Sequence, residues 1–188
     1  AKVHKVAQRA IVPAVTYGAT VFGTPESCVA ELRTQIAEAL PGKHAGRSQR
    51  LRLYQYDADP QPSIRALPIY RWATMHWDNI VDPCHLHHAW QRAKAEDALH
   101  RLEWSRTTGP AATTLLSARA CGWEWITPWS WRTASNILID IRVHCPRDIQ
   151  KQAKFDATAA GWREWTTDPA RQHLSPAPLT NPIRTWCR

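Results

Sequence analysis

The chain has 188 residues, of which 44% are hydrophobic and 21% are charged, a globular balance that excludes disorder throughout. The 24 Lys and Arg residues exceed the 16 Asp and Glu residues, and the resulting charge of +8 favours an anionic partner, nucleic acid first. No stretch approaches the roughly 18 consecutive apolar residues that a membrane-spanning helix needs. Because cations also interrupt the first twenty residues, we expect neither a signal peptide nor a membrane partner.

Cysteine usage predicts a reducing compartment. The cysteines are odd in number, widely spaced and without a Cys-x-x-Cys pair: Cys28, Cys84, Cys121, Cys145 and Cys187. Free thiols are typical of intracellular proteins, so we expect a nuclear or cytoplasmic location. The seven glycines form no phosphate-binding loop, so we expect no cofactor. Because the chain opens at Ala1 rather than Met, we expect a piece of a longer polypeptide.

Two helices are expected before residue 42. Apolar residues at helical spacing predict the first over 2–16. The second is predicted over 25–40, with Thr24 as the N-cap, Pro25 as the first helical residue and Pro41-Gly42 as the stop. Its apolar residues share one face, which should pack on a core: Val29, Leu32, Ile36 and Leu40.

A basic, acid-free stretch over 43–52 follows that helix and is predicted to be a loop. The segment Asp-Ala-Asp-Pro-Gln-Pro over 57–62 is typical of a linker, and it gives the best candidate for a domain boundary. The next helix is expected over 63–77. It should be kinked or start late, because Pro68 lacks the N–H that a helix interior requires.

The rest of the chain predicts three more helices and a small sheet. Start and stop residues predict helices over 82–104, 110–121 and 146–165. Between the last two, apolar and polar residues alternate strictly over 136–144. This pattern predicts a half-buried strand, which we expect to pair with 123–127.

These elements predict a mainly α fold with a small β element near 123–144. We expect a helical region with the basic loop over 1–60 and a helical connector domain that holds the β element over 61–168. Closely spaced prolines predict an irregular tail over 169–188.

The run from Cys84 to His88 is the densest set of potential metal ligands. Cys84 and His88 would meet on one helix face, but zinc needs two further ligands from distant residues such as His76 or Cys121. Histidines at a helix start usually lie on the surface, so we expect no metal site.

A metal-dependent nuclease is an alternative hypothesis. Asp140 on the alternating segment, followed by Asp148 and Lys151, provides carboxylates beside a cation, as metal-dependent phosphodiester cleavage requires. We favour a simpler interpretation, in which Asp140, Arg142 and His144 form the polar face of a half-buried strand, because periodicity explains this pattern without chemistry. No serine or cysteine nucleophile motif and no Asp-Asp pair occurs, so the sequence assigns no catalytic residue.

The 11 tryptophans suggest another alternative, a structural or protein-interaction subunit. Pairs such as Arg71-Trp72 could also offer a cation and a ring to nucleic acid. Trp at helical or strand spacing is usually core, so we expect most of the tryptophans to fill the interior. The basic stretch over 43–52 is better placed for phosphate contacts.

Residues 11–19, Ile-Val-Pro-Ala-Val-Thr-Tyr-Gly-Ala, resemble a family. With Val21-Phe22-Gly23 they resemble the stretch after the polymerase core of non-LTR retrotransposon reverse transcriptases, where Trp is usual in place of Phe22. Residues 32–46 are similar to the thumb and connector of divergent protist elements of this kind. Gly109-Pro110, Leu115-Leu116 and Gly122-Trp123 resemble the continuation of that region, so that the resemblance covers about 11–165.

This resemblance implies a non-catalytic region that contacts nucleic acid. The family's Asp-Asp hairpin lies upstream of such a segment, so the implied partners are an upstream polymerase core in the same polyprotein and RNA or DNA. Thumb helices follow the template-primer backbone, and the implied phosphate contacts are Arg9, Lys43, Arg47, Arg50 and Arg52. No catalytic residue carries over.

Overall fold

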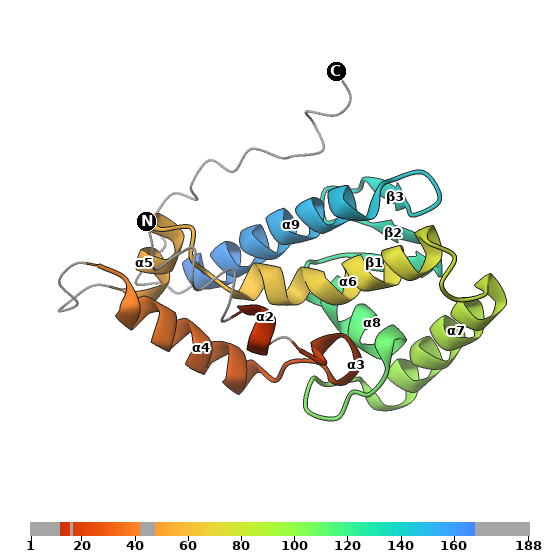
Figure 1. The fold of residues 1–188 in the computed structure, drawn as a ribbon, viewed down its shortest axis with the longest axis horizontal. Coiled ribbons are helices and arrows are strands. Elements are labelled where there is room, and N and C mark those ends of the chain that lie inside the picture. Colours follow the sequence, from red (N-terminus) through yellow and green to blue (C-terminus); the bar gives the residue numbers. More distant parts are fainter. Residues whose placement is uncertain (1–11, 16, 42–47, 168–188) are drawn as a thin grey trace, which may run out of the picture.

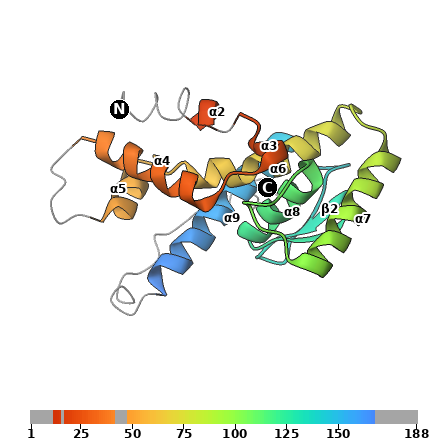
Figure 2. The same ribbon diagram turned by 90° about the horizontal axis from the view of Figure 1, so that it is seen from below.

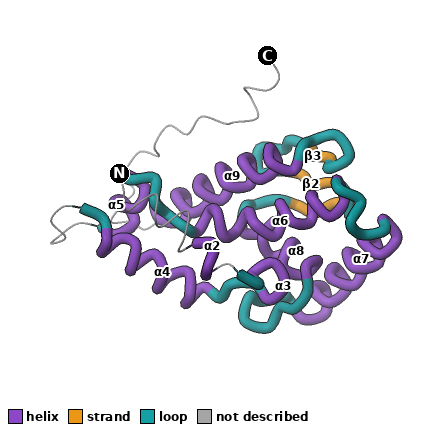
Figure 3. Tube along the Cα trace, in the orientation of Figure 1, coloured by secondary structure: helices purple, strands orange, loops and turns teal. Residues whose placement is uncertain are grey.

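A computed structural model describes residues 12–15, 17–41 and 48–167 of the chain. These residues form a mainly helical fold with one small antiparallel sheet, which confirms the predicted fold class (Figure 1). The strands gather at one end of the elongated molecule, as Figure 3 shows by colour. Among the described helices, none is long and apolar enough to cross a membrane.

The described helices are α2 (Val12–Val15), α3 (Ala19–Phe22), α4 (Glu26–Ala39), α5 (Gln49–Gln55), α6 (Gln61–Trp77), α7 (Pro83–His100), α8 (Pro110–Ala120) and α9 (Pro146–Thr166). The described strands are β1 (Glu124–Thr127), β2 (Ser130–Arg132) and β3 (Leu138–Asp140). Helices α6 and α9 run side by side along the molecule, while α4 and α5 lie at the end away from the sheet (Figure 1). Helix α8 packs between α6 and α7 (Figure 2).

Helix α4 forms where the sequence predicts it, and its apolar face is buried as expected. That face belongs to an N-terminal cluster of Val29, Leu32, Ile36, Ala37, Leu40, Leu53, Ala58 and Ile64. The predicted cap at Thr24 is wrong, because the N-cap is Pro25 and no side chain caps the helix. The carbonyl of Thr24 instead accepts a hydrogen bond from Arg65 at 3.2 Å.

The predicted loop over 43–52 is wrong at its C-terminal end, because α5 begins at Gln49. Residues 42–47 lie outside the described part. Leu53 of α5 enters the N-terminal cluster, which gives this short helix a buried anchor. Ile64 of α6 joins the same cluster, so the cluster reaches past residue 60; the division into three regions stays a prediction.

Helix α6 starts at Gln61, earlier than predicted, and continues through Pro68. Proline cannot donate an intrahelical hydrogen bond, which makes it unfavourable in a helix interior. Burial opposes this cost, because Ile69, Trp72 and Ala73 in the following turn are fully buried. Packing therefore maintains a helix that local propensity alone would interrupt.

Helices α7, α8 and α9 begin as predicted. The carboxylate of Asp82 caps α7 by accepting a hydrogen bond from the N–H of Cys84 at 2.7 Å. Helix α7 ends at His100 rather than at 104, and the carboxylate of Asp97 accepts a hydrogen bond from the N–H of Leu102 in the turn that follows. The predicted helix over 2–16 and the predicted tail over 169–188 lie wholly or mostly outside the described residues.

The sheet differs from the predicted pairing. Its strand order is β1-β2-β3, so 123–127 pairs with the unpredicted middle strand β2 and not with 136–144. Strand β3 is also shorter than the predicted strand. Across the sheet, Trp125, Trp131 and Ile139 are in register and buried, so one face packs on the helices.

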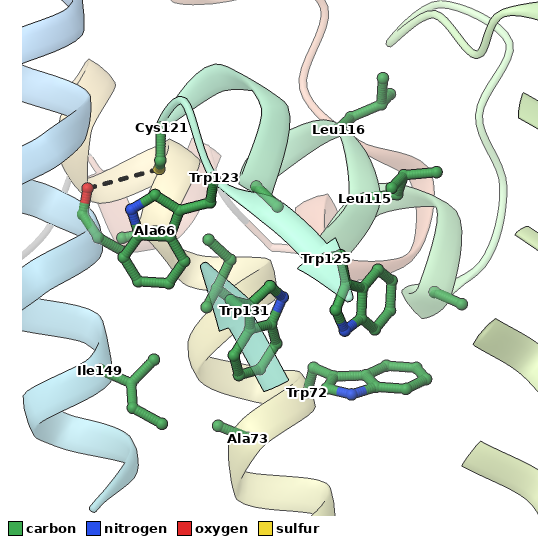
Figure 4. Packing of buried hydrophobic residues seen from close by; sticks show 14 of the residues in the cluster. Ala66, Trp72, Ala73, Leu115, Leu116, Cys121, Trp123, Trp125, Trp131 and Ile149 are labelled. Carbon is green, nitrogen blue, oxygen red and sulfur yellow. Dashed lines mark hydrogen bonds between the residues drawn. The ribbon is translucent and has the colours of Figure 1, made fainter. Parts of the chain in front are cut away.

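Tryptophans dominate the main core, as the sequence predicts. Trp72 packs edge-on against Trp125 with ring centroids 4.9 Å apart, and its indole N–H donates to the carbonyl of Pro128 at 2.8 Å. Trp131 stacks beside Trp125, and Ile149 of α9 lines the same core (Figure 4). The sheet is therefore attached to α6 and α9 through large aromatic side chains.

Candidate nucleic-acid interface

Of the five arginines and lysines that the resemblance implies as phosphate contacts, the structure describes two. Arg9, Lys43 and Arg47 lie outside the described residues, while Arg50 and Arg52 lie on α5. Both described side chains contact other parts of the protein.

The Arg52 guanidinium is turned into the protein. The residue is 5% exposed, and Nη2 donates to the carbonyls of Leu40 at 2.7 Å and Pro41 at 3.4 Å. These carbonyls lie just beyond α4, where a helix leaves backbone acceptors without intrahelical partners. Arg52 thus holds the end of α4 against α5, and its guanidinium is not presented to a phosphate in this structure.

The side chain of Arg50 extends from α5 toward α9. Its Nη2 is 3.7 Å from a carboxylate oxygen of Glu164, and its side chain is mostly buried. The neighbouring Tyr54 donates a hydrogen bond to the carbonyl of Thr158 at 3.4 Å, and its ring meets that of Trp162 edge-on at 5.1 Å. Arg50 therefore belongs to a contact that fixes α5 on α9.

The positive charge of the chain is not distributed evenly between the described and remaining residues. The described residues contain 16 of the 24 Lys and Arg and 15 of the 16 Asp and Glu, a net charge of +1. The other +7 belongs to the remaining residues and falls within 1–11, 42–47 and 168–188, which we call the basic segments. Taken together, the described residues therefore carry almost no net charge.

Two of the basic segments join the folded body at the same end. The chain re-enters at Ser48 after 42–47, one residue before α5, and it leaves α9 at Thr167 before 168–188. The contact between Arg50 and Glu164 brings these two points together, and Figure 1 shows α5 beside the C-terminal end of α9. The residues that precede α5 and follow α9, to which two of the basic segments are joined, therefore lie near each other.

The carboxylates of the nuclease hypothesis are occupied by neighbouring cations. Both oxygens of Asp140 accept hydrogen bonds from the Arg142 guanidinium, which holds the pKa of the carboxyl below its ordinary value. Asp140 also accepts from the N–H of Arg142, a local turn that ends β3. Asp148 pairs with Lys151 at 3.0 Å. Asp140 and Arg142 therefore form a local ion pair at the end of β3, where the expected strand face does not continue.

Within the described ranges, no group of three or more His, Cys, Asp or Glu side chains could hold a metal ion. The His87 ring instead stacks near that of Trp129, with centroids 6.4 Å apart. Cys28, Cys84, Cys121 and Cys145 are free thiols.

Sequence reasoning missed Tyr54 and Lys154, which line a pocket between α5, α6 and α9. Lys154 lies in mid-helix on α9, where a lysine ordinarily faces solvent, and neither residue belongs to a motif. The pair Arg71-Trp72, which the sequence suggested as a cation and ring for nucleic acid, does not have both side chains on the surface. Arg71 is exposed, but its neighbour Trp72 is fully buried, so the pair cannot present a ring to a base.

Comparison with known proteins adds no relative: no protein-family model, no curated protein and no solved structure matches the chain significantly.

Proposed function

We propose that this chain is a non-catalytic nucleic-acid-binding region whose basic segments contact the phosphate backbone. The observation that carries the proposal is the net charge of +8, with an acid-free basic stretch over 43–52. Backbone contacts of this kind are electrostatic, depend on salt and read little sequence.

The attachment geometry supports the same proposal. Segments 42–47 and 168–188 start from points that the contact between Arg50 and Glu164 brings together. Charges that leave from one end can neutralise neighbouring phosphates of one duplex, which gives more affinity than the same charges on opposite faces. Arg52 has a structural role in this proposal, because its guanidinium binds backbone carbonyls.

The test compares two double variants of equal charge. Lys43→Gln with Arg47→Gln removes two cations from a basic segment, whereas Arg101→Gln with Arg106→Gln removes two exposed cations from the folded body. Binding of a labelled DNA duplex is measured by fluorescence anisotropy from ~50 to ~200 mM salt.

We expect the wild-type affinity to fall with salt. The first variant should flatten the slope of log K against log salt by about 0.9 per lost phosphate contact, or about 1.8 in total. The control should change this slope much less. Wild-type binding that is independent of salt, or equal effects of the two variants, would contradict the proposal.

The resemblance to the thumb and post-polymerase region of non-LTR reverse transcriptases extends the proposal to a partner. In that role the chain would strengthen the binding of nucleic acid by an RNA-directed DNA polymerase core located upstream in the same polyprotein. Sequencing of the transcript upstream of Ala1 tests this part separately. A continuous frame that encodes an Asp-Asp hairpin supports it, and a frame without one removes the polymerase while leaving nucleic-acid binding intact.

A further inference from the structure

The start of α7 presents a cysteine and a histidine to solvent on one helical face. Cys84 and His88 are four residues apart in one continuous helix, and both are exposed. Residues at this spacing are neighbours, with Cβ atoms about 5 to 6 Å apart. Cys84 is a free thiol, and the ring of His88 lies beside that of His87, with centroids 6.4 Å apart. Among the described residues, neither the thiol nor the imidazole of this pair forms a hydrogen bond or an ion pair, so both can bind a ligand from solvent.

The same turn of α7 is fixed on the rest of the protein. The carboxylate of Asp82 accepts the N–H of Cys84 at 2.7 Å and caps the helix. On the inner side, Leu86 is buried in the main core, and the ring of His87 stacks near that of Trp129. These contacts keep the exposed cysteine and histidine on the outer side at the spacing of one helical turn. A pair of ligands on a fixed helix needs little reorganisation to bind a metal ion.

The number of ligands selects the kind of metal ion. The expectation of no metal site concerned zinc, which binds four ligands in structural sites. A monovalent soft ion such as Cu(I) is satisfied by two ligands in line, and thiolate and imidazole are both ligands that copper accepts. Bonds of about 2.0 to 2.3 Å place the sulfur and nitrogen atoms about 4.3 Å apart. Side chains one helical turn apart can span this distance.

We propose that Cys84 and His88 bind one Cu(I) ion between the thiolate sulfur and an imidazole nitrogen. The thiol releases its proton to solvent when the sulfur binds the metal, so that the thiolate balances the charge of the ion and copper keeps its oxidation state. The capping carboxylate of Asp82 adds a negative charge at the same turn. The site is independent of nucleic-acid binding, because α7 lies at the end of the molecule away from α5 (Figure 1).

The probe is Cu(I), supplied as its coloured complex with bathocuproine disulfonate under anaerobic conditions with ascorbate as the reductant. Transfer of the metal to the full chain is followed by the loss of absorbance of this complex. Cys84→Ser and His88→Gln each remove one ligand. Cys28→Ser is the control for a thiol, because Cys28 is exposed in the first turn of α4 but has Leu32, not a histidine, four residues later. His100→Gln is the control for a histidine, because His100 is exposed at the other end of α7.

We expect the wild type to take Cu(I) from the chelator at a site that Cys84→Ser and His88→Gln each weaken by roughly tenfold or more. Both controls should leave this affinity unchanged. An equal concentration of Zn²⁺ should not displace the copper, because the pair lacks the further ligands that zinc needs. Circular dichroism checks that each variant is folded, which the exposure of both ligands favours. Absence of transfer, unchanged affinity in His88→Gln, an equal loss in Cys28→Ser, or displacement by Zn²⁺ would overturn the proposal.

Discussion

Asp156 provides a direct test of the core, because it is a carboxylate buried among tryptophans. It is 3% exposed and accepts hydrogen bonds from the indole N–H of Trp123 at 2.7 Å and the amide of Gln152 at 3.0 Å. Burial raises its pKa above the ordinary value of 3.8, although the two hydrogen bonds act to lower it. The folded protein therefore holds the proton of Asp156 more tightly than the unfolded chain does.

The sign of the pH dependence follows from this shift. A carboxyl with a raised native pKa stabilises the fold fully below pH 3.8, and this contribution is lost as the pH rises through the native pKa. Asp156→Asn removes the titration and keeps an acceptor for Trp123. Relative to Asp156→Asn, the wild type should lose about 1.4 kcal/mol of unfolding free energy for each unit by which its pKa is raised.

Asp156→Leu has a different effect, because it leaves both donors without their acceptor. Each buried unsatisfied group costs about 1 to 3 kcal/mol, so the two together should cost about 2 to 6 kcal/mol near pH 4. This cost relative to the wild type should shrink at higher pH, where the wild type itself loses stability. Asp156→Asn should stay within about 1 kcal/mol of the wild type near pH 4. Its amide can also donate to the Gln152 carbonyl oxygen, which has no hydrogen-bond partner among the described residues.

The assay is urea unfolding followed by tryptophan emission at several pH values between 4 and 8. Asp148→Asn serves as the control, because this carboxylate lies on the same helix but is partly exposed and pairs with Lys151. The reasoning would be refuted by two results. One is a stability difference between wild type and Asp156→Asn that does not change with pH, and the other is a cost for Asp156→Asn as large as that for Asp156→Leu.

Two further predictions concern contacts between elements. Arg33→Gln should lower the unfolding free energy by about 1.5 to 3 kcal/mol, because the buried Asp59 carboxylate loses its charged partner. The control Gln35→Ala, on the exposed side of α4, should change the unfolding free energy little. Equal urea midpoints for the two variants would contradict this prediction. Trp72→Phe should lower the unfolding free energy by about 1 to 3 kcal/mol, because it removes the hydrogen bond to the Pro128 carbonyl and leaves a small void. Thermal unfolding measures the change, and an unchanged melting temperature would count against the role of this hydrogen bond.

Helices with local start signals could be predicted from the sequence. Pro25, Pro83, Pro110 and Pro146 each stand within one residue of a helix start, and the expected elements begin there. The short helix α5 could not be predicted in this way. Its cations suggested a loop, whereas the burial of Leu53 and the bond from Arg52 to Leu40 depend on how α4 ends.

The strand over 136–144 shows why periodicity alone misplaced the sheet. Alternation extends past Asp140, but the Asp140 side chain accepts the N–H of Arg142 and ends the strand. Val143, which continues the apolar pattern, is consequently 73% exposed. Ile141 is buried in the main core, and its N–H donates a hydrogen bond to the carbonyl of Trp129 in the turn between β1 and β2.

The cations of the candidate site likewise show that sequence position alone does not predict which charged side chains are exposed. Along the sequence the cations look evenly spread, yet in the fold several of them serve the body itself. Arg65 is 1% exposed, donates to the Thr24 carbonyl, pairs with Glu26 and lies 4.1 Å over the ring of Trp104. Cations used in this way cannot also neutralise phosphates without loss of stability. The net charge alone therefore does not show which cations are available for binding, because that depends on the contacts that each cation makes in the fold.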